Sequence, residues 1–229
     1  MLTPAEWEIL RLSLAVAALA TLVSLPFAIA VSWLLARTEF IGKSLVDALV
    51  HAPLVLPPVA IGYLLLVVFG TRGPVGKWLL DTFNVRLIFT MQGAILAAAV
   101  MAFPLMVRGI RLSLDAVDRD LEAAARTLGA TRRDVFLSVT LPLMLPGILS
   151  GSVVGFARSL GEFGATITFA ANIEGQTRTL PLAIYTATQT PNGDAIALRL
   201  VVLSMSLALV ALIASDWLER RLRTWLRRA

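Results

Sequence analysis

Five stretches of this 229-residue chain contain no charged side chain. A helix needs about 20 apolar residues, each rising 1.5 Å, to cross about 30 Å of hydrocarbon. Four stretches meet that length, and the fifth does so once its apolar flanks are included. The pattern therefore predicts an all-α integral membrane protein with about five transmembrane helices, near residues 12–36, 46–69, 88–108, 138–158 and 196–217.

Prolines interrupt two of these predicted spans: Pro53, Pro57 and Pro58 in the second, Pro142 and Pro146 in the fourth. Proline removes a backbone donor and disturbs a helix, but neighbouring helices in a membrane bundle can satisfy the freed carbonyl groups. We therefore expect two kinked helices that line an interior. A buried kink without a transport role is the alternative.

The composition supports a single membrane domain over residues 1–229. Hydrophobic residues make up 58% of the chain and charged residues 15%, whereas soluble domains carry about 25% charged residues. A cytoplasmic loop is expected at 109–137, and no segment between the predicted spans is long enough for a separate soluble domain.

The distribution of Lys and Arg predicts the orientation. With the N-terminus outside, thirteen of the twenty basic residues fall in segments that face the cytoplasm, including the 109–137 loop and the C-terminus. The positive-inside rule therefore favours an N-out, C-in topology. The net charge of +5 reflects this asymmetry and does not indicate nucleic-acid binding, because no basic face is interleaved with stacking aromatic residues. Trp217 and Trp225, beside the terminal arginines, are typical of an anchor on membrane lipid.

The most informative segment, residues 115–146, is predicted to form two short helices joined at a glycine. Asp118 is a candidate cap for the first helix, and Gly129 suits the left-handed position that ends it. The second helix would start with a capping box of Thr131 and Asp134 and continue into the membrane. An apolar stripe at helical spacing consists of Leu121, Ala124, Ala125 and Leu128. Because this stripe is built largely of alanine, a partner can approach closely; a loop that only rests on lipid is the alternative.

The spacing of this segment resembles the cytoplasmic EAA loop of type I ABC importer permeases. That pattern has Glu-Ala-Ala, three residues, Gly, nine residues, Ile, any residue and Leu-Pro. The matching positions here are Ala123, Ala124, Ala125, Gly129, Val139, Leu141 and Pro142. Two residues depart from the pattern, since Ala123 occupies the glutamate position, with Glu122 one residue earlier, and Val139 replaces isoleucine.

The resemblance implies the type I importer permease fold and a coupling helix that docks on a separate ATPase. The contact core would be Ala123, Ala124, Ala125 and Gly129, with Glu122 and Arg126 at its rim. ATP and Mg²⁺ would belong to that partner, present in two copies, and the chain itself would be neither an enzyme nor a cofactor protein. Gly42-Lys43-Ser44 is similar to the end of a phosphate-binding loop, but Arg37 stands where that pattern requires glycine.

Residues 52–66 and 157–166 resemble the molybdate and sulfate permease group, and the length of the chain favours the molybdate branch. This implies a homodimeric molybdate permease in the cytoplasmic (inner) membrane, loaded by a periplasmic or other extracellular molybdate-binding protein. Sulfate, thiosulfate and tungstate are alternative substrates. An ion-coupled secondary transporter is disfavoured because the spans contain almost no acids or histidines. A membrane-bound enzyme is disfavoured because no nucleophile–base pair, metal set or cofactor motif is evident.

Candidate residues for the translocation path or gate lie after the fourth span. Arg158, Ser159 and Thr166 offer a cation and hydroxyls to a tetrahedral dianion. We interpret Glu162 as a structural partner of Arg158, four residues earlier, near the outer gate. The neighbouring glycines are expected to permit close helix packing. His51 is expected to pack or hydrogen-bond, and no metal site is predicted.

Overall fold

The computed structural model describes residues 2–226 and is all-helical in that range, without strands. Its elements, in chain order, are α1 (Pro4–Arg37), α2 (Lys43–Val55), α3 (Pro58–Phe69), α4 (Pro74–Phe83), α5 (Met91–Asp115), α6 (Arg119–Thr127), α7 (Arg132–Val135), the π-helical turn η1 (Phe136–Thr140), α8 (Leu141–Leu160), α9 (Gly164–Phe169), α10 (Leu180–Thr188) and α11 (Asp194–Leu226).

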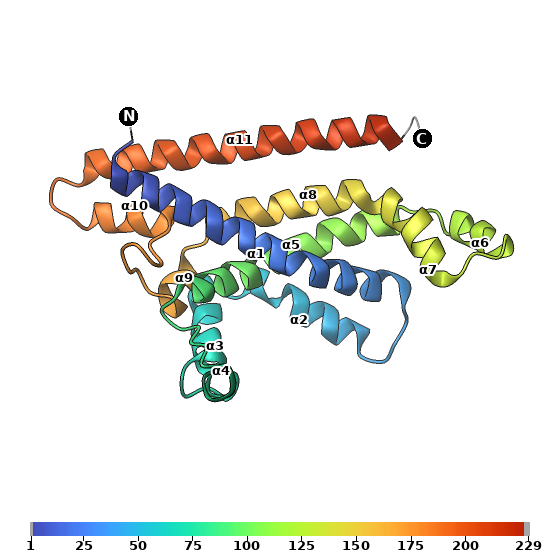
Figure 1. Cartoon of the computed structure of the whole chain (residues 1–229), viewed down its shortest axis with the longest axis horizontal. Coiled ribbons are helices and arrows are strands. Elements are labelled where there is room, and N and C mark those ends of the chain that lie inside the picture. The colour runs from blue at the N-terminus through green and yellow to red at the C-terminus, as the bar shows by residue number, and fades with distance from the viewer. Residues whose placement is uncertain (1, 227–229) are drawn as a thin grey trace.

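The long helices α1, α5 and α8 pack side by side at the centre of the molecule, and α11 lies along α8 (Figure 1). Small residues bring α5 and α8 together. A Cβ atom added to Gly151 would lie 3.1 Å from the Met106 carbonyl oxygen, and one added to Gly155 would lie 2.5 Å from Met106 Cγ. A Cβ atom on Gly109 would lie 3.1 Å from Gly151 Cα. Helix packing, the role expected for the glycines of α8, is therefore confirmed for Gly151 and Gly155.

Four of the predicted spans correspond to single continuous stretches of helix. Within the described residues, α1, α5, the α7–α8 stretch and the first part of α11 are long and apolar enough to cross a membrane. Helix α5 continues to Asp115, beyond residue 108, where the third predicted span ends. The isolated charges Arg108 and Arg111 lie on the last turns of α5 and do not mark its end.

The second predicted span, 46–69, is not a kinked helix but two helices, α2 and α3, bent by 118° at their break. Pro57 and Pro58 follow each other at this point. The residue before a proline is driven out of helical conformation, and Leu56 is extended, with φ −73° and ψ 144°. Two prolines in succession therefore end one helix and start another, where a single proline would only bend it. The pair counts as one span only as a broken helix.

The fourth span forms one stretch of helix with a π turn in it. Pro142 lacks the N–H group that would bond to the carbonyl of Ser138, and η1 lies at this position, immediately before α8. Inserted π turns are a common response to a disrupted helical ladder. The predicted kink is therefore a local change of helical pitch that leaves α7, η1 and α8 continuous.

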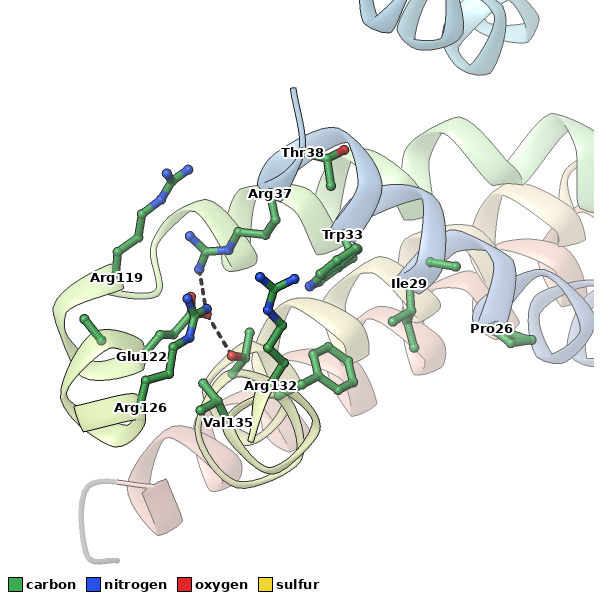
Figure 2. Close-up of a pocket in the computed structure, with 14 residues that line it drawn as sticks. Pro26, Ile29, Trp33, Arg37, Thr38, Arg119, Glu122, Arg126, Arg132 and Val135 are labelled. Carbon is green, nitrogen blue, oxygen red and sulfur yellow. Dashed lines mark hydrogen bonds and ion pairs between the residues drawn. The ribbon is translucent and has the colours of Figure 1, made fainter. Parts of the chain in front are cut away.

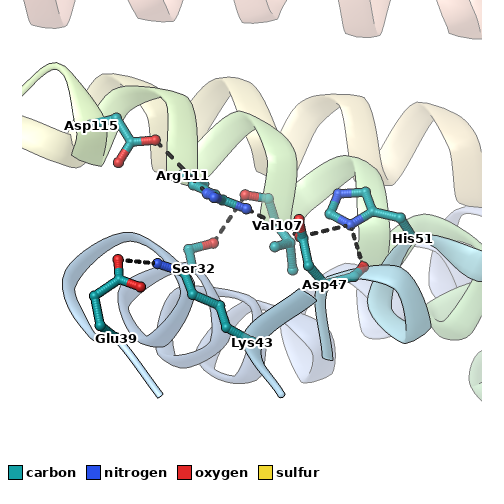
Figure 3. Close-up of polar contacts among 8 residues, drawn as sticks. All are labelled: Ser32, Glu39, Lys43, Asp47, His51, Val107, Arg111 and Asp115. Atoms are coloured by element: carbon teal, nitrogen blue, oxygen red, sulfur yellow. Dashed lines mark hydrogen bonds and ion pairs between the residues drawn. The ribbon is translucent and has the colours of Figure 1, made fainter. Parts of the chain in front are cut away.

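Helix α2 has no buried residues, and polar side chains tie it to α5 (Figure 3). Asp47 pairs with Arg111 of α5 at 3.1 Å, and Arg111 also lies 3.8 Å from Asp115. His51 Nδ1 lies 2.9 Å from the backbone oxygen of Asp47 and 3.3 Å from its carboxylate. The hydrogen-bonding role predicted for His51 is thus confirmed.

The two ends of the molecule differ in their elements. Helix α1 begins near α10 and ends near α6 and α7, at the end where α11 also finishes (Figure 1). This places the predicted coupling segment, the 38–42 loop and the end of α11 together. At this end Trp217 is exposed, with the Arg221 guanidinium 5.0 Å from its ring centre; the side chain of Trp225 is outside the described residues.

Candidate coupling site and gate

Helix α6 is defined at both ends by its own sequence. The Asp118 carboxylate accepts a hydrogen bond from the Asp120 backbone N–H at 2.9 Å. At the other end Gly129 has φ +89°, and the Ala130 N–H donates to the Ala125 carbonyl at 3.1 Å. These contacts satisfy backbone groups that a helix end otherwise leaves free. The predicted cap at Asp118 and hinge at Gly129 are confirmed.

The second part of the loop follows the prediction as closely. Thr131 and Asp134 form a reciprocal capping box, with the Thr131 N–H donating to the Asp134 carboxylate at 3.1 Å and the Asp134 N–H donating to Thr131 Oγ1 at 3.3 Å. Helix α7 therefore starts at Arg132 and continues through η1 into α8. The second part of the loop is therefore continuous with a long central helix.

The apolar stripe of α6 is available for a partner. No residue of α6 is buried, and Leu121 and Leu128 are 49% and 89% exposed. Ala124 is also exposed and Ala125 half-buried. Exposed apolar patches of this kind are typical of interaction sites. The stripe predicted from the spacing is present, on a helix too short to be stable without support.

Ala123 and Arg126 lie on another side of α6. Both line a cavity of about 760 Å³ between α6 and the second half of α1 (Figure 2). At 100° per residue, Ala123 points away from the stripe. Ala123 thus lies on a different side of α6 from Ala124 and Ala125, and the expected contact core of Ala123, Ala124, Ala125 and Gly129 stays a prediction.

The Glu122 side chain points inward, which the sequence did not indicate. It is only 13% exposed and pairs with Arg37, at the end of α1, at 3.2 Å. It also accepts a hydrogen bond from Thr140 Oγ1 at 2.8 Å (Figure 2). Arg37 donates as well to the carbonyl oxygens of Leu114 and Val117, at 3.2 and 3.4 Å. One carboxylate and one guanidinium thus connect α6 with α1, the end of α5 and η1.

The Glu122 carboxylate is thus occupied within the chain, and its expected role at the rim of an ATPase contact stays a prediction. Its partners Arg37 and Thr140 lie 85 positions upstream and 18 positions downstream in the sequence. Neither Arg37 nor Thr140 stands out in the sequence. Each is separated from Glu122 by at least one other helix, and no periodic pattern links them.

A surface pair lies beside this site. Lys43 donates to the Glu39 carboxylate at 2.8 Å. This hydrogen bond and the Lys43 charge lower the pKa of Glu39, and the charge of Arg119 at the start of α6 lowers it further. The loop after α1 and the first turn of α6 are therefore electrostatic neighbours.

The candidate gate contains the predicted ion pair. Arg158 lies 2.6 Å from Glu162, whose side chain is 1% exposed. Helix α8 ends at Leu160, so the pair spans the end of α8 and the turn that follows. The Ala165 N–H donates to Glu162 at 2.9 Å. The structural interpretation of Glu162 is supported, because its carboxylate joins the end of α8 to the start of α9.

Ser159 and Thr166, the two candidate hydroxyls, are buried. Ser159 Oγ has no hydrogen-bond partner among the described residues. Other hydroxyls nearby are occupied by their own helices: Ser152 donates to the Ile148 carbonyl and Thr168 to the Gly164 carbonyl. A role of Ser159 and Thr166 in the path stays a prediction. No group of three or more His, Cys, Asp or Glu residues suited to a metal ion is found in the described part of the chain.

Comparison with known proteins identifies the family. Residues 24–224 match the family described as binding-protein-dependent transport system inner membrane component. The chain belongs to this family of membrane permeases. The molybdenum transport system permease protein ModB of Escherichia coli K12 is 58% identical over 96% of both chains, and that of Haemophilus influenzae is 54% identical over 95% of both.

Solved structures show the same fold in other ABC transporters. A bacterial ABC transporter involved in the import of alginate contains a chain with a TM-score of 0.76, 18% identity, and coverage of 96% of this permease and 80% of that chain. The MetNI methionine ABC transporter, in an inward-facing form, has a chain with a TM-score of 0.68 and 18% identity, covering 95% of this permease and 94% of that chain. The permease therefore has the predicted type I ABC importer fold.

Proposed function

We propose that this chain is the membrane-spanning subunit of an ATP-driven molybdate importer. The observation that carries the proposal is the identity of 58% over nearly the whole length of the E. coli ModB permease. The E. coli sulfate transport permease CysT is 37% identical over 80% of this chain and 66% of its own length. The larger identity and fuller coverage favour molybdate over sulfate. Tungstate, a dianion of the same shape and charge, is the closest alternative.

The importer would contain two copies of the permease, two copies of a separate ATPase that binds ATP and Mg²⁺, and an external molybdate-binding protein. The family description itself refers to binding-protein-dependent transport. One of the similar solved structures is an alginate transporter in complex with a substrate-bound periplasmic protein. The homodimer and the molybdate specificity of the external protein extend these observations to the present chain.

Coupling would use the exposed stripe of α6 as the contact with the ATPase. Leu121, Ala124 and Leu128 would enter a groove on that subunit, and small residues would permit close approach. Movement of α6 would pass along two routes: through the continuous helix α7–η1–α8, and through the ion pair of Glu122 with Arg37 into α1. Because α8 packs tightly on α5, the displacement would reach the centre of the bundle.

The substrate and the class of transporter are tested by reconstitution. The permease, its ATPase and its binding protein are placed in proteoliposomes, and uptake is measured with molybdate, tungstate and sulfate in competition. We expect ATP-dependent molybdate uptake that tungstate competes with and sulfate does not. Stimulation by sulfate alone would overturn the molybdate assignment, and uptake driven by an ion gradient without ATP would overturn the class. A complex with a catalytically inactive ATPase is the control.

Docking of the ATPase is tested by Leu121→Asp in the stripe of α6. A carboxylate placed in an apolar contact costs binding energy at the centre of an interface. We expect the amount of ATPase that co-purifies with the permease to fall by about tenfold or more. The matched control is Asp120→Asn, one residue away on an exposed position of the same helix. Equal ATPase binding by both variants would contradict the proposed contact.

A further inference from the structure

The cavity between α1 and α6 has two chemically different walls. One wall is apolar and aromatic, formed by Ile29 and Trp33 of α1 with Val135 and Phe136 from α7 and η1. The other is basic, formed by Arg37, Arg119, Arg126 and Arg132. Glu122 is the single carboxylate among the lining residues, so the lining has a formal charge of about three positive. A site of this composition selects an anion with an apolar part.

Arg37 carries an unpartnered donor on a buried side chain that lines this cavity. Its side chain is 9% exposed, and one terminal nitrogen makes the contacts with Glu122, Leu114 and Val117. Its Nε is buried and has no hydrogen-bond partner among the described residues. Buried donors are nearly always paired, because an unpaired one has lost its hydration without compensation. An acceptor oxygen inside the cavity would satisfy it.

Three arginines of the basic wall are free to bind such an acceptor. Arg119, Arg126 and Arg132 make no ion pair with any carboxylate in the described part of the chain at salt-bridge distance. Figure 2 shows Arg126 and Arg132 extending from α6 and α7 on the same side as Arg37. Guanidinium groups bind phosphate oxygens in bidentate fashion and remain charged at any physiological pH.

The surface leading to the cavity indicates where the ligand comes from. Leu22, Val23 and Phe27 of α1 are 63%, 54% and 63% exposed. They lie on a helix long and apolar enough to span a membrane, and Trp33, 42% exposed, follows on the way to the cavity. Tryptophan near the end of a membrane-spanning helix is typical of the membrane interface. A ligand that diffuses in the bilayer reaches the arginines along this face, whereas a small aqueous anion would make no contact with the apolar wall.

We propose that this cavity binds an anionic phospholipid of the cytoplasmic leaflet. The phosphate lies against Arg37, Arg126 and Arg132, and an acyl chain lies along Ile29, Trp33 and Phe136. Basic pockets between helices on the cytoplasmic side of membrane proteins are suited to such head groups. The choice of leaflet rests on the proposed function, in which α6 meets a cytoplasmic ATPase. The bound lipid fills the cavity between α6 and α1 and stabilises the position of α6 relative to α1.

The test uses the assembled importer, exchanged into nanodiscs and analysed by native mass spectrometry for retained lipid. The probes are phosphatidylglycerol, which is anionic, and phosphatidylcholine, which has no net charge. We expect the wild-type complex to retain phosphatidylglycerol preferentially. Loss of two arginines, in Arg126→Gln with Arg132→Gln, should lower its retention by about tenfold or more. Arg133→Gln is the matched control, because Arg133 is exposed and does not line the cavity.

Each alternative occupant of the cavity predicts a different result in this experiment. Equal retention of both lipids, or unchanged retention in the double variant, would overturn the proposal. Failure of the wild-type complex to retain either lipid would also overturn it and would indicate that the ATPase or a second permease copy fills the cavity. Displacement of phosphatidylglycerol by millimolar inorganic phosphate would show an aqueous anion site instead.

Two further measurements separate this proposal from folding defects and from the proposed function. If the double variant does not assemble, the single variants Arg132→Gln and Trp33→Ala are measured in its place. Trp33→Ala should weaken retention of phosphatidylglycerol without changing the charge of the site. Lipid retention is read without any transport, so absence of molybdate uptake by the wild type would count against the proposed function alone. Uptake without any lipid preference would count against the lipid site alone.

Discussion

The described part of the permease contains two arginine–glutamate pairs that are largely buried, and they connect very different parts of the chain. Arg158 and Glu162 are four residues apart and join the end of α8 to the start of α9. Arg37 and Glu122 are 85 residues apart and join α6 to the end of α1, with Thr140 of η1 as a third partner. The first pair fixes a local turn, and the second holds a surface helix to the membrane helices.

This difference indicates what each pair contributes. Breaking a local pair disturbs a turn that the folded bundle depends on, so its main effect should be on stability. Breaking the long-range pair leaves α6 capped and attached through α7, so its main effect should be on the transmission of movement. Stability and coupling can be measured separately, which makes the contrast testable.

The largest loss of stability is expected for Glu162→Ala. It leaves Arg158 without its partner and the Ala165 N–H unsatisfied, and removing one member of a buried pair costs about 3–5 kcal/mol. The measurement is the yield and the thermal midpoint of the purified permease. Glu162→Gln, which keeps an acceptor for the N–H, should lose less and impair assembly or gating before selectivity. Unchanged yield and uptake in Glu162→Gln would refute the structural role of this carboxylate.

A smaller loss of stability but a larger loss of coupling is expected for Glu122→Ala. Arg37 keeps its hydrogen bonds to the Leu114 and Val117 carbonyl oxygens when the Glu122 carboxylate is removed, so we expect about 2 kcal/mol of destabilisation. The molybdate transported per ATP hydrolysed should fall several-fold because α6 is no longer held to α1. Asp120→Asn on the same helix serves as the control. A double-mutant cycle with Arg37→Met measures the interaction, expected at about 1–3 kcal/mol; additive effects would mean that the two residues act independently.

The smallest effect is expected for Asp47→Asn, in the cluster that ties α2 to α5. Asp47 and Arg111 have side chains 40% and 30% exposed, and such pairs contribute about 0–1 kcal/mol. The thermal midpoint of the variant should therefore differ little from that of the wild type. The difference should be smaller still at high salt, because salt screens exposed charges. A loss of stability as large as that of Glu162→Ala would show that the exposure of the side chains does not determine how much these ion pairs contribute to stability.

Much of the coupling segment could be predicted because its structure is local. Asp118, Gly129, Thr131 and Asp134 act on backbone groups within a few residues, and each was correctly assigned from spacing alone. The same holds for the ion pair of Arg158 and Glu162. The kink predicted between α2 and α3 is wrong, because Pro57 and Pro58 in succession end one helix and start another, whereas a single proline would only bend it.

The sequence by itself determined the membrane class, the helical ends of the coupling segment and its apolar stripe. These depend on hydropathy and on short-range hydrogen bonds, both of which act between neighbouring residues. Only the tertiary structure decided that Glu122 turns inward to Arg37 and Thr140, that Ala123 faces a basic cavity, and that Arg37 keeps an unpaired buried donor there. Those contacts exist because packing brings α1, α6 and η1 together, and no periodicity in the chain encodes which of their side chains meet.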